Sequence, residues 1–104
     1  MVNSGKSEYL EYYASFSRYD QPLNLTHKIT KEQAESHALE AAYYIGYYDA
    51  DRKLTRVVKM LRGSVFMDTT YTYYPSGRLK TILHKKADGR ITVQEFDKAG
   101  KLKE

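Results

Sequence analysis

Apolar and polar residues alternate along most of this chain with a period of two, which is typical of β-strands. Near the start, Leu10, Tyr12, Ala14 and Phe16 fall on one face of an extended segment. Tyrosine itself favours strands over helices. The alternation therefore predicts a strand over residues 9–16. Further strands or extended segments are predicted over residues 22–25, 42–49, 53–61, 65–74, 78–85, 90–97 and 101–104.

A short phrase recurs between the strands predicted in the second half of the chain. Each copy has an aromatic or strand-like start, a turn of Asp, Ser, Pro or Gly, a basic residue, and then an aliphatic residue. This composition predicts β-hairpin connections, and Asp88-Gly89 is the dipeptide that best fits a type I′ turn. We expect positive φ at Gly77, Gly89 and Gly100. The copies lie at residues 48–54, 74–79, 87–91 and 96–102.

One segment carries helical rather than β signals. Thr30 can accept from the backbone amide of Gln33, and the Gln33 side chain can reach back to Thr30. Ala34 and Ala38 belong to a stripe of small residues at helical spacing, which allows close docking on a sheet. We therefore predict a helix over residues 30–41.

These elements predict an α+β fold, an antiparallel β-meander of about six to eight strands with one short helix packed on one face. A chain of 104 residues suits a single domain spanning residues 1–104. Its predicted parts are a flexible tail (residues 1–7), N-terminal strands (8–29), the helix (30–41) and the hairpin-repeat meander (42–104).

The core is expected where the apolar faces of the strands meet the helix. A hydrophobic content of 41% and a charged content of 29% place the chain among globular proteins rather than disordered ones. We expect the following side chains to be buried under the helix: Leu10, Leu23, Leu25, Leu54, Leu79, Leu83, Ile91 and Val93.

Tyrosine is the unusual component, with 11 residues against 3 Phe and no Trp. We interpret the tyrosines as cross-strand pairs that stabilise a sheet. The alternative interpretation is a stacking platform for bases or sugars.

The net charge of +4 is unevenly spread, with −3 on residues 1–50 and +7 on residues 51–104. Such asymmetry indicates either a polyanion partner or a solvated sheet face whose lysines and arginines discourage edge pairing. A polyanion or partner surface would combine these cations with aromatic rings. Its candidate members are Arg56, Tyr74, Arg78, Lys80, His84, Arg90 and Phe96.

Candidate chemistry is sparse. The sequence has no cysteine and no P-loop, dinucleotide-binding glycine motif, H-E-x-x-H or nucleophile elbow. His37 and Glu40 stand one helical turn apart, but a metal site needs further ligands that the sequence does not indicate. Asp49 and Asp51 suit a turn in which Asp accepts from backbone amides. We expect no catalytic residue, no metal and no cofactor.

Apolar runs are only a few residues long, so no segment is predicted to span a membrane. The first residues are polar and lack the apolar stretch of a secretory signal. These features lead us to expect a cytoplasmic protein.

Two resemblances add to this picture. The hairpin phrase resembles the YD-type repeats of Rhs proteins and the YwqK-like variants of MORN repeats, which have Y-x-x-x-G-x-L hairpins. Most of the chain, over roughly residues 9–80, resembles a family of uncharacterised small bacterial proteins, a domain of unknown function. It departs from the repeat at Arg52 and Lys53, where a Gly is usual, and in an extra hairpin from Lys85 onward. The resemblance implies no activity, cofactor or catalytic residue. The matching residues are Tyr13, Ser15, Pro22, Leu23, Asn24, Leu25, Tyr43, Tyr44, Tyr47, Tyr48, Asp49, Lys59, Gly63, Tyr71, Thr72, Tyr73, Tyr74, Gly77 and Leu79.

We interpret the chain as a non-catalytic protein-interaction module. An open meander leaves at least one unpaired edge, to which a strand of a protein partner or of a second copy can add. The alternative is binding of single-stranded RNA or DNA on the basic sheet face. A third alternative is a small enzyme. The sequence does not name the partner.

Overall fold

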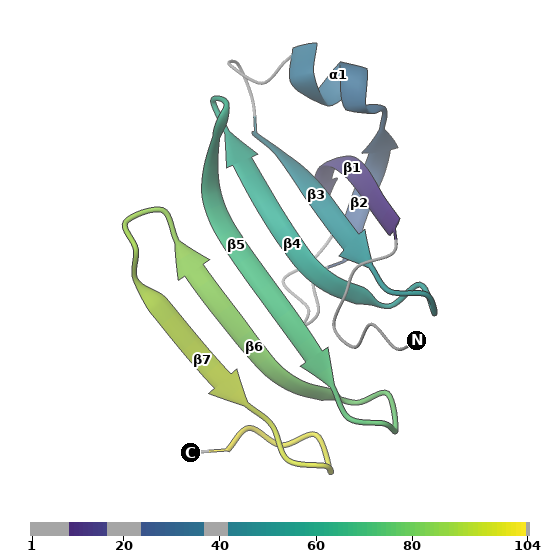
Figure 1. Cartoon of the computed structure of the whole chain (residues 1–104), viewed down its shortest axis with the longest axis vertical. Coiled ribbons are helices and arrows are strands. Elements are labelled where there is room, and N and C mark those ends of the chain that lie inside the picture. Colours follow the sequence, from purple (N-terminus) through teal and green to yellow (C-terminus); the bar gives the residue numbers. More distant parts are fainter. Residues whose placement is uncertain (1–8, 17–23, 37–41, 104) are drawn as a thin grey trace.

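The computed structural model describes residues 9–16, 24–36 and 42–103. These residues form one seven-stranded antiparallel sheet and one short helix, with the strand order β2-β1-β3-β4-β5-β6-β7 (Figure 1). The predicted α+β meander is thereby confirmed. The elements are β1 (Tyr9–Phe16), β2 (Leu25–Ile29), α1 (Lys31–Ser36), β3 (Ala42–Tyr48), β4 (Leu54–Leu61), β5 (Ser64–Tyr73), β6 (Leu79–Lys86) and β7 (Ile91–Glu95).

The recurring sequence phrase forms the same turn at each of its four positions. In the β5–β6 connection, the Tyr74 amide donates to the Arg78 carbonyl and the Gly77 amide donates to the Tyr74 carbonyl, both at 2.8 Å. Gly77 has φ of 95°, as expected for the last residue of a three-residue hairpin loop. The equivalent residues Gly89 and Gly100 also have positive φ, which confirms the prediction. In the β3–β4 turn, Arg52 takes this position with φ of 63°.

The type I′ turn lies at a different place from the one predicted. A type I′ turn needs positive φ at both central residues. At Asp88-Gly89 only Gly89 has positive φ, so the prediction there is wrong, and the Asp88 carboxylate instead accepts from the Arg90 amide at 2.9 Å. Both central residues have positive φ at Arg62 (52°) and Gly63 (80°), between β4 and β5.

The main hydrophobic cluster lies on one side of the sheet, which we call the inner face. Tyr44, Val57, Tyr71 and Ile82 extend from β3, β4, β5 and β6 on this side, and each is at most 6% exposed. Leu54 joins the same cluster. We call the opposite side of the sheet the outer face.

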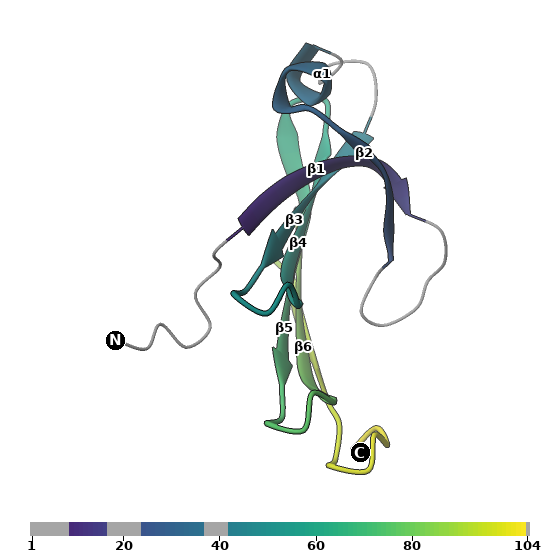
Figure 2. The same ribbon diagram turned by 90° about the vertical axis from the view of Figure 1, so that its right-hand side faces the viewer.

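The β1–β2 hairpin bends over the inner face and covers part of it, as the edge-on view shows (Figure 2). The Phe16 ring meets the Tyr44 ring edge-on, with centroids 5.6 Å apart. A methyl group of Leu25 comes so close to Gly46 that a β-carbon there would lie only 2.8 Å from it. Glycine at this position therefore lets the hairpin approach the sheet.

The helix plays a smaller part in covering the core than the sequence predicts. The capping pair forms as expected, with the Gln33 amide 3.0 Å from the Thr30 hydroxyl and the Thr30 amide 2.9 Å from the Gln33 side chain. Ala34 is 2% exposed, and α1 packs against β1 at one end of the sheet. Ala38 and the rest of the predicted stripe lie outside the described residues.

Several predicted core residues are not buried. Leu25, Leu79 and Leu83 are half-buried, Leu10 is exposed, and Leu23 lies outside the described residues. Ile91 and Val93 are each 56% exposed.

A β-bulge explains the error on β6 and β7. Tyr73 pairs with Leu79 while Thr72 pairs with Thr81, so Lys80 is an extra residue. One extra residue reverses the alternation of faces. Leu79 and Ile82 therefore share the inner face, while Leu83 lies on the outer face. Val93 pairs with Leu83, and Ile91 pairs with Lys85, so both follow to the outer face.

Candidate functional site

The β7 strand forms one edge of the sheet, and all five of its residues are exposed. The Phe96 amide donates to the Lys80 carbonyl at 2.8 Å. This bond shows which residue pairs between β6 and β7 are the hydrogen-bonded ones. Because hydrogen-bonded and non-bonded pairs alternate in an antiparallel ladder, the backbone groups of Ile91 and Val93 point away from β6. This edge therefore offers unpaired donors and acceptors beside two exposed aliphatic side chains.

The chain itself limits the open part of this edge. The Lys103 amide donates to the Glu95 carbonyl at 2.7 Å, and Leu102 forms a single antiparallel bridge with Phe96. The predicted last strand is thus reduced to one bridge pair. At the other end, the three-residue turn closed by Lys86 and Arg90 precedes the strand. Residues 91–94 are the stretch that a partner strand can reach.

The opposite edge, β2, is interrupted. His27 has φ of 58°, which is uncommon for a residue other than glycine and breaks the extended path. The Ser15 hydroxyl lies 2.8 Å from His27 Nδ1 and 2.9 Å from the Thr26 hydroxyl, which ties this irregular segment to β1. Irregular edges resist strand addition. Of the two edges, β7 is the regular one.

A strip of aliphatic side chains borders the open edge on the outer face. Leu83 pairs with Val93, and Ile91 lies beside them on the same strand as Val93. The exposure of Ile91 and Val93 shows that no described residue covers this part of the outer face. We call Leu83, Ile91 and Val93 the outer strip.

The residues predicted to form a polyanion surface are spread over both faces and the turns. Arg56 lies on the outer face and forms a bidentate ion pair with Asp68. Its Nε donates to Oδ1 at 2.9 Å and its Nη2 donates to Oδ2 at 2.6 Å. The hydrogen bonds to Asp68 raise the pKa of Arg56. His84 lies on the inner face, and Arg90 pairs with Asp88 of its own turn at 2.6 Å.

The remaining candidates lie at the end of the sheet where β5 meets β6. Arg78 donates to the Ala99 carbonyl at 2.7 Å, and the Lys80 ammonium lies 5.7 Å from the centre of the Tyr74 ring. The Tyr74 hydroxyl donates to the Phe96 carbonyl at 2.7 Å. Phe96 packs against the core. These rings and cations therefore contact one another and the backbone within the protein.

Sequence reasoning missed a set of contacts between successive turns, which we call the turn ladder (residues 49–53, 74–78 and 97–101). In the first two turns, the basic residue after the positive-φ position reaches toward the next turn of the ladder. The Lys53 ammonium bonds the Gly77 carbonyl at 3.1 Å, and Arg78 bonds Ala99 in the same way. A basic residue recurs at this position in the sequence, and this recurrence could have predicted the contacts.

Comparison with known proteins places the chain in a family. The model of a family described as "Family of unknown function (DUF6156)" matches residues 5–104. The chain belongs to this family. No curated protein and no solved structure matches it. Membership of DUF6156 confirms the expectation of an uncharacterised family, and it leaves the function to be argued from the geometry.

The Tyr13 phenol of this DUF6156 protein is hydrogen-bonded to two other side chains, those of Tyr48 and Glu11. Burial, together with the Tyr48 hydroxyl 2.8 Å away and the Glu11 carboxylate, raises the pKa of the Tyr13 phenol. Tyr13 therefore stays protonated and serves as a donor to Glu11.

Two further observations concern metals and membranes. Among the described residues, no group of three or more His, Asp or Glu side chains is placed to hold a metal ion. His37 and Glu40 lie outside the described residues. Within the described part of the chain, no helix has the length and apolar character needed to cross a membrane.

Proposed function

We propose that this protein is a non-catalytic protein-interaction module that binds an extended segment of a partner along β7. The observation that carries the proposal is the open edge at Ile91 and Val93, where outward backbone groups lie beside exposed aliphatic side chains. Adding a strand to an exposed sheet edge is an established mode of peptide recognition, in which the backbone bonds give affinity and alternate side chains give specificity.

The surroundings of the edge indicate the chemistry of the partner. Alternate residues of an added strand would lie beside the outer strip, so apolar side chains fit there. Lys85 and Lys86 lie at the end of β6, beside the start of β7, which favours an acidic residue at that end of the partner. A second copy would bring two basic halves together, so an acidic-flanked segment of another protein fits better.

Binding can be tested with a synthetic peptide of alternating valine and threonine flanked by glutamates, against the same peptide flanked by lysines. We expect the acidic peptide to slow hydrogen exchange of the outward amides of Ile91 and Val93, since these are the groups it would bond. The Val93→Lys change should weaken binding about tenfold or more, because a lysine on an edge strand opposes pairing.

Val65→Lys is the matched control, because Val65 is a similarly exposed strand valine (51%) on β5, which is separated from β7 by β6. It should leave binding unchanged. Equal loss in both variants, or protection that does not involve residues 91–94, would refute edge binding. Concentration-dependent protection of the same amides without peptide would identify a second copy as the partner instead.

We also propose that the hairpin phrase belongs to the class seen in YD-type and MORN-variant repeats. Three copies share an aromatic residue paired with a leucine six positions later, across a turn with one positive-φ residue. The pairs are Tyr48 with Leu54, Tyr73 with Leu79, and Phe96 with Leu102.

A further inference from the structure

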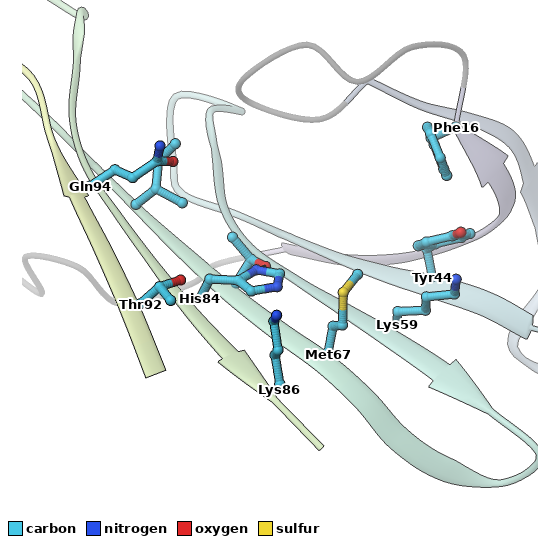
Figure 3. Close-up of a pocket in the computed structure, with 10 residues that line it drawn as sticks. Phe16, Tyr44, Lys59, Met67, His84, Lys86, Thr92 and Gln94 are labelled. Carbon is cyan, nitrogen blue, oxygen red and sulfur yellow. The ribbon is translucent and has the colours of Figure 1, made fainter. Parts of the chain in front are cut away.

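A trough of about 590 Å³ lies on the inner face between the covering hairpin and β7 (Figure 3). Phe16 and Tyr44 stand on one side, His84, Thr92 and Gln94 stand on the other, and Met67 lies between them. This volume is in the range of roughly 300–1,000 Å³ that small-molecule sites occupy. The trough opens on the face opposite to the outer strip.

The trough has an apolar floor and a cationic rim. Its floor is formed by Tyr44, Met67 and Ile82, and its rim carries the ammonium groups of Lys59 and Lys86. None of the described residues that line it is a carboxylate. A ligand that fits this lining therefore combines an apolar body with a negative charge.

The two lysines differ in their surroundings. The Lys59 ammonium lies 5.7 Å from the centre of the Tyr44 ring and 5.2 Å from that of Phe66, so it already contacts two aromatic rings. Lys86 is exposed and forms no ion pair with any described residue. Lys86 is thus the cation best placed to meet an incoming anion.

His84 adds an oriented polar group between the floor and the rim. Its Nδ1 lies 2.7 Å from the hydroxyl of Thr69, a residue that is only 8% exposed. This bond fixes the ring. When the Thr69 hydroxyl donates to Nδ1, the hydrogen is carried by Nε2, which can donate to a carboxylate oxygen.

We propose that the trough binds a small amphipathic carboxylate, with its apolar chain on Tyr44, Met67 and Ile82 and its carboxylate toward Lys86. The apolar floor supplies most of the affinity by removing the chain from water. The cationic rim selects the anion over a neutral or cationic molecule of the same shape, since like charges oppose binding.

The proposal can be tested by NMR titration of the full chain with octanoate, 1-octanol and octylammonium. We expect octanoate to shift the amide signals of Ile82, His84 and Thr92 and to bind at least about tenfold more tightly than octylammonium. Equal binding of all three would show that the trough is an apolar surface without charge selection and would overturn the proposal. Absence of octanoate shifts at these amides would overturn it as well.

Two neighbouring lysines provide a matched pair of variants. Lys86→Gln removes a rim charge, whereas Lys85→Gln removes the same charge from the opposite face, where Lys85 pairs with Ile91. We expect Lys86→Gln to weaken octanoate binding about fivefold or more and to leave 1-octanol binding unchanged. Lys85→Gln should change neither. Equal effects of the two variants would mean that only the overall charge matters, which contradicts a site at the trough.

Discussion

The ammonium of Lys53 donates a hydrogen bond of 3.1 Å to the carbonyl of Gly77, which lies 24 residues further along the chain. The same ammonium lies 4.7 Å from the centre of the Tyr73 ring. One side chain thus joins two successive turns of the turn ladder, and stabilises the end of the sheet where three hairpins meet.

Replacing Lys53 with methionine should lower the free energy of unfolding by about 0.5–1.5 kcal/mol, because a partly buried hydrogen bond and a cation–π contact are lost while the apolar stem is kept. Urea denaturation measures the change. Lys101→Met alters the equivalent position of the last turn, where the structure describes no such contact, and should change stability by less than about 0.5 kcal/mol. Equal changes in the free energy of unfolding for the two variants would show that the contact between Lys53 and Gly77 does not stabilise the protein.

The glycines at the positive-φ position should differ in their tolerance of a β-carbon. Gly89 has φ of 92° and open space around it, so Gly89→Ala should cost about 1 kcal/mol through backbone strain alone. At Gly77 a β-carbon would also lie 3.0 Å from the Lys53 ammonium. Gly77→Ala should therefore cost more than Gly89→Ala in thermal unfolding. The reverse order would contradict the turn geometry.

The bulge at Lys80 predicts which apolar residues carry the core. Ile82 is 4% exposed, and Ile82→Ala should lower the free energy of unfolding by about 2–5 kcal/mol. Ile91 is 56% exposed, and Ile91→Ala should lower it by less than about 1 kcal/mol. Similar losses in the two variants would show that β7 is covered and that the outer strip does not exist.

The Glu11 carboxylate predicts a pH dependence of stability. A hydrogen bond from Lys28 lowers the pKa of Glu11 from its ordinary value, and the Tyr13 hydroxyl also donates to it at 3.0 Å. Because the folded pKa is the lower one, this contribution is complete above the unfolded pKa and is lost as the pH falls through the folded value. In Glu11→Gln the melting temperature should therefore fall less steeply as the pH drops below the ordinary pKa of a glutamate. An unchanged acid profile would show that this carboxylate is not coupled to folding.

Nucleic-acid binding has a separate signature. Affinity that comes from bases stacking on an aromatic ring is less sensitive to salt than affinity from charge contacts, and it is lost when the ring is removed. The Tyr74 hydroxyl is bound to the Phe96 carbonyl and its ring lies beside Lys80, so we expect no stacking site there. Any affinity for short single strands should vanish by about 0.15 M salt and be the same in Tyr74→Ala. Tight binding at about 0.15 M salt that is weakened in Tyr74→Ala would favour nucleic-acid recognition over edge binding as the function.

The turns and strands could be predicted because their signals are local. Gly77 and Gly100 occupy positions where only a residue without a β-carbon is unstrained, and alternation identified most strands. Beyond Tyr73, the sequence could not predict which side chains lie on which face of the sheet. The bulge at Lys80 reverses the alternation of all later side chains, and a lysine gives no sign of a bulge. Ile91 and Val93 therefore looked like core residues.

The candidate sites show a similar division. The sequence indicated that a meander has a free edge, and the strand order shows that the two edges are β2 and β7. The irregularity of β2 lies in the positive φ of His27, which a histidine in the sequence does not predict. The trough depends on the hairpin bending over the sheet. That bend brings Phe16 to Tyr44, a contact between distant parts of the chain that no local pattern encodes.

The strand order also has a consequence for the way the chain folds. From β3 to β7 every strand pairs with its neighbour in sequence, and short loops close with little loss of entropy, so we expect these hairpins to form early. The pairing of β1 with β3 must enclose β2 and α1, which makes it the most distant contact of the sheet. The β1–β2 hairpin should accordingly dock last. Until it does, Tyr44 faces water, and the wall of the trough is completed only in the final step of folding.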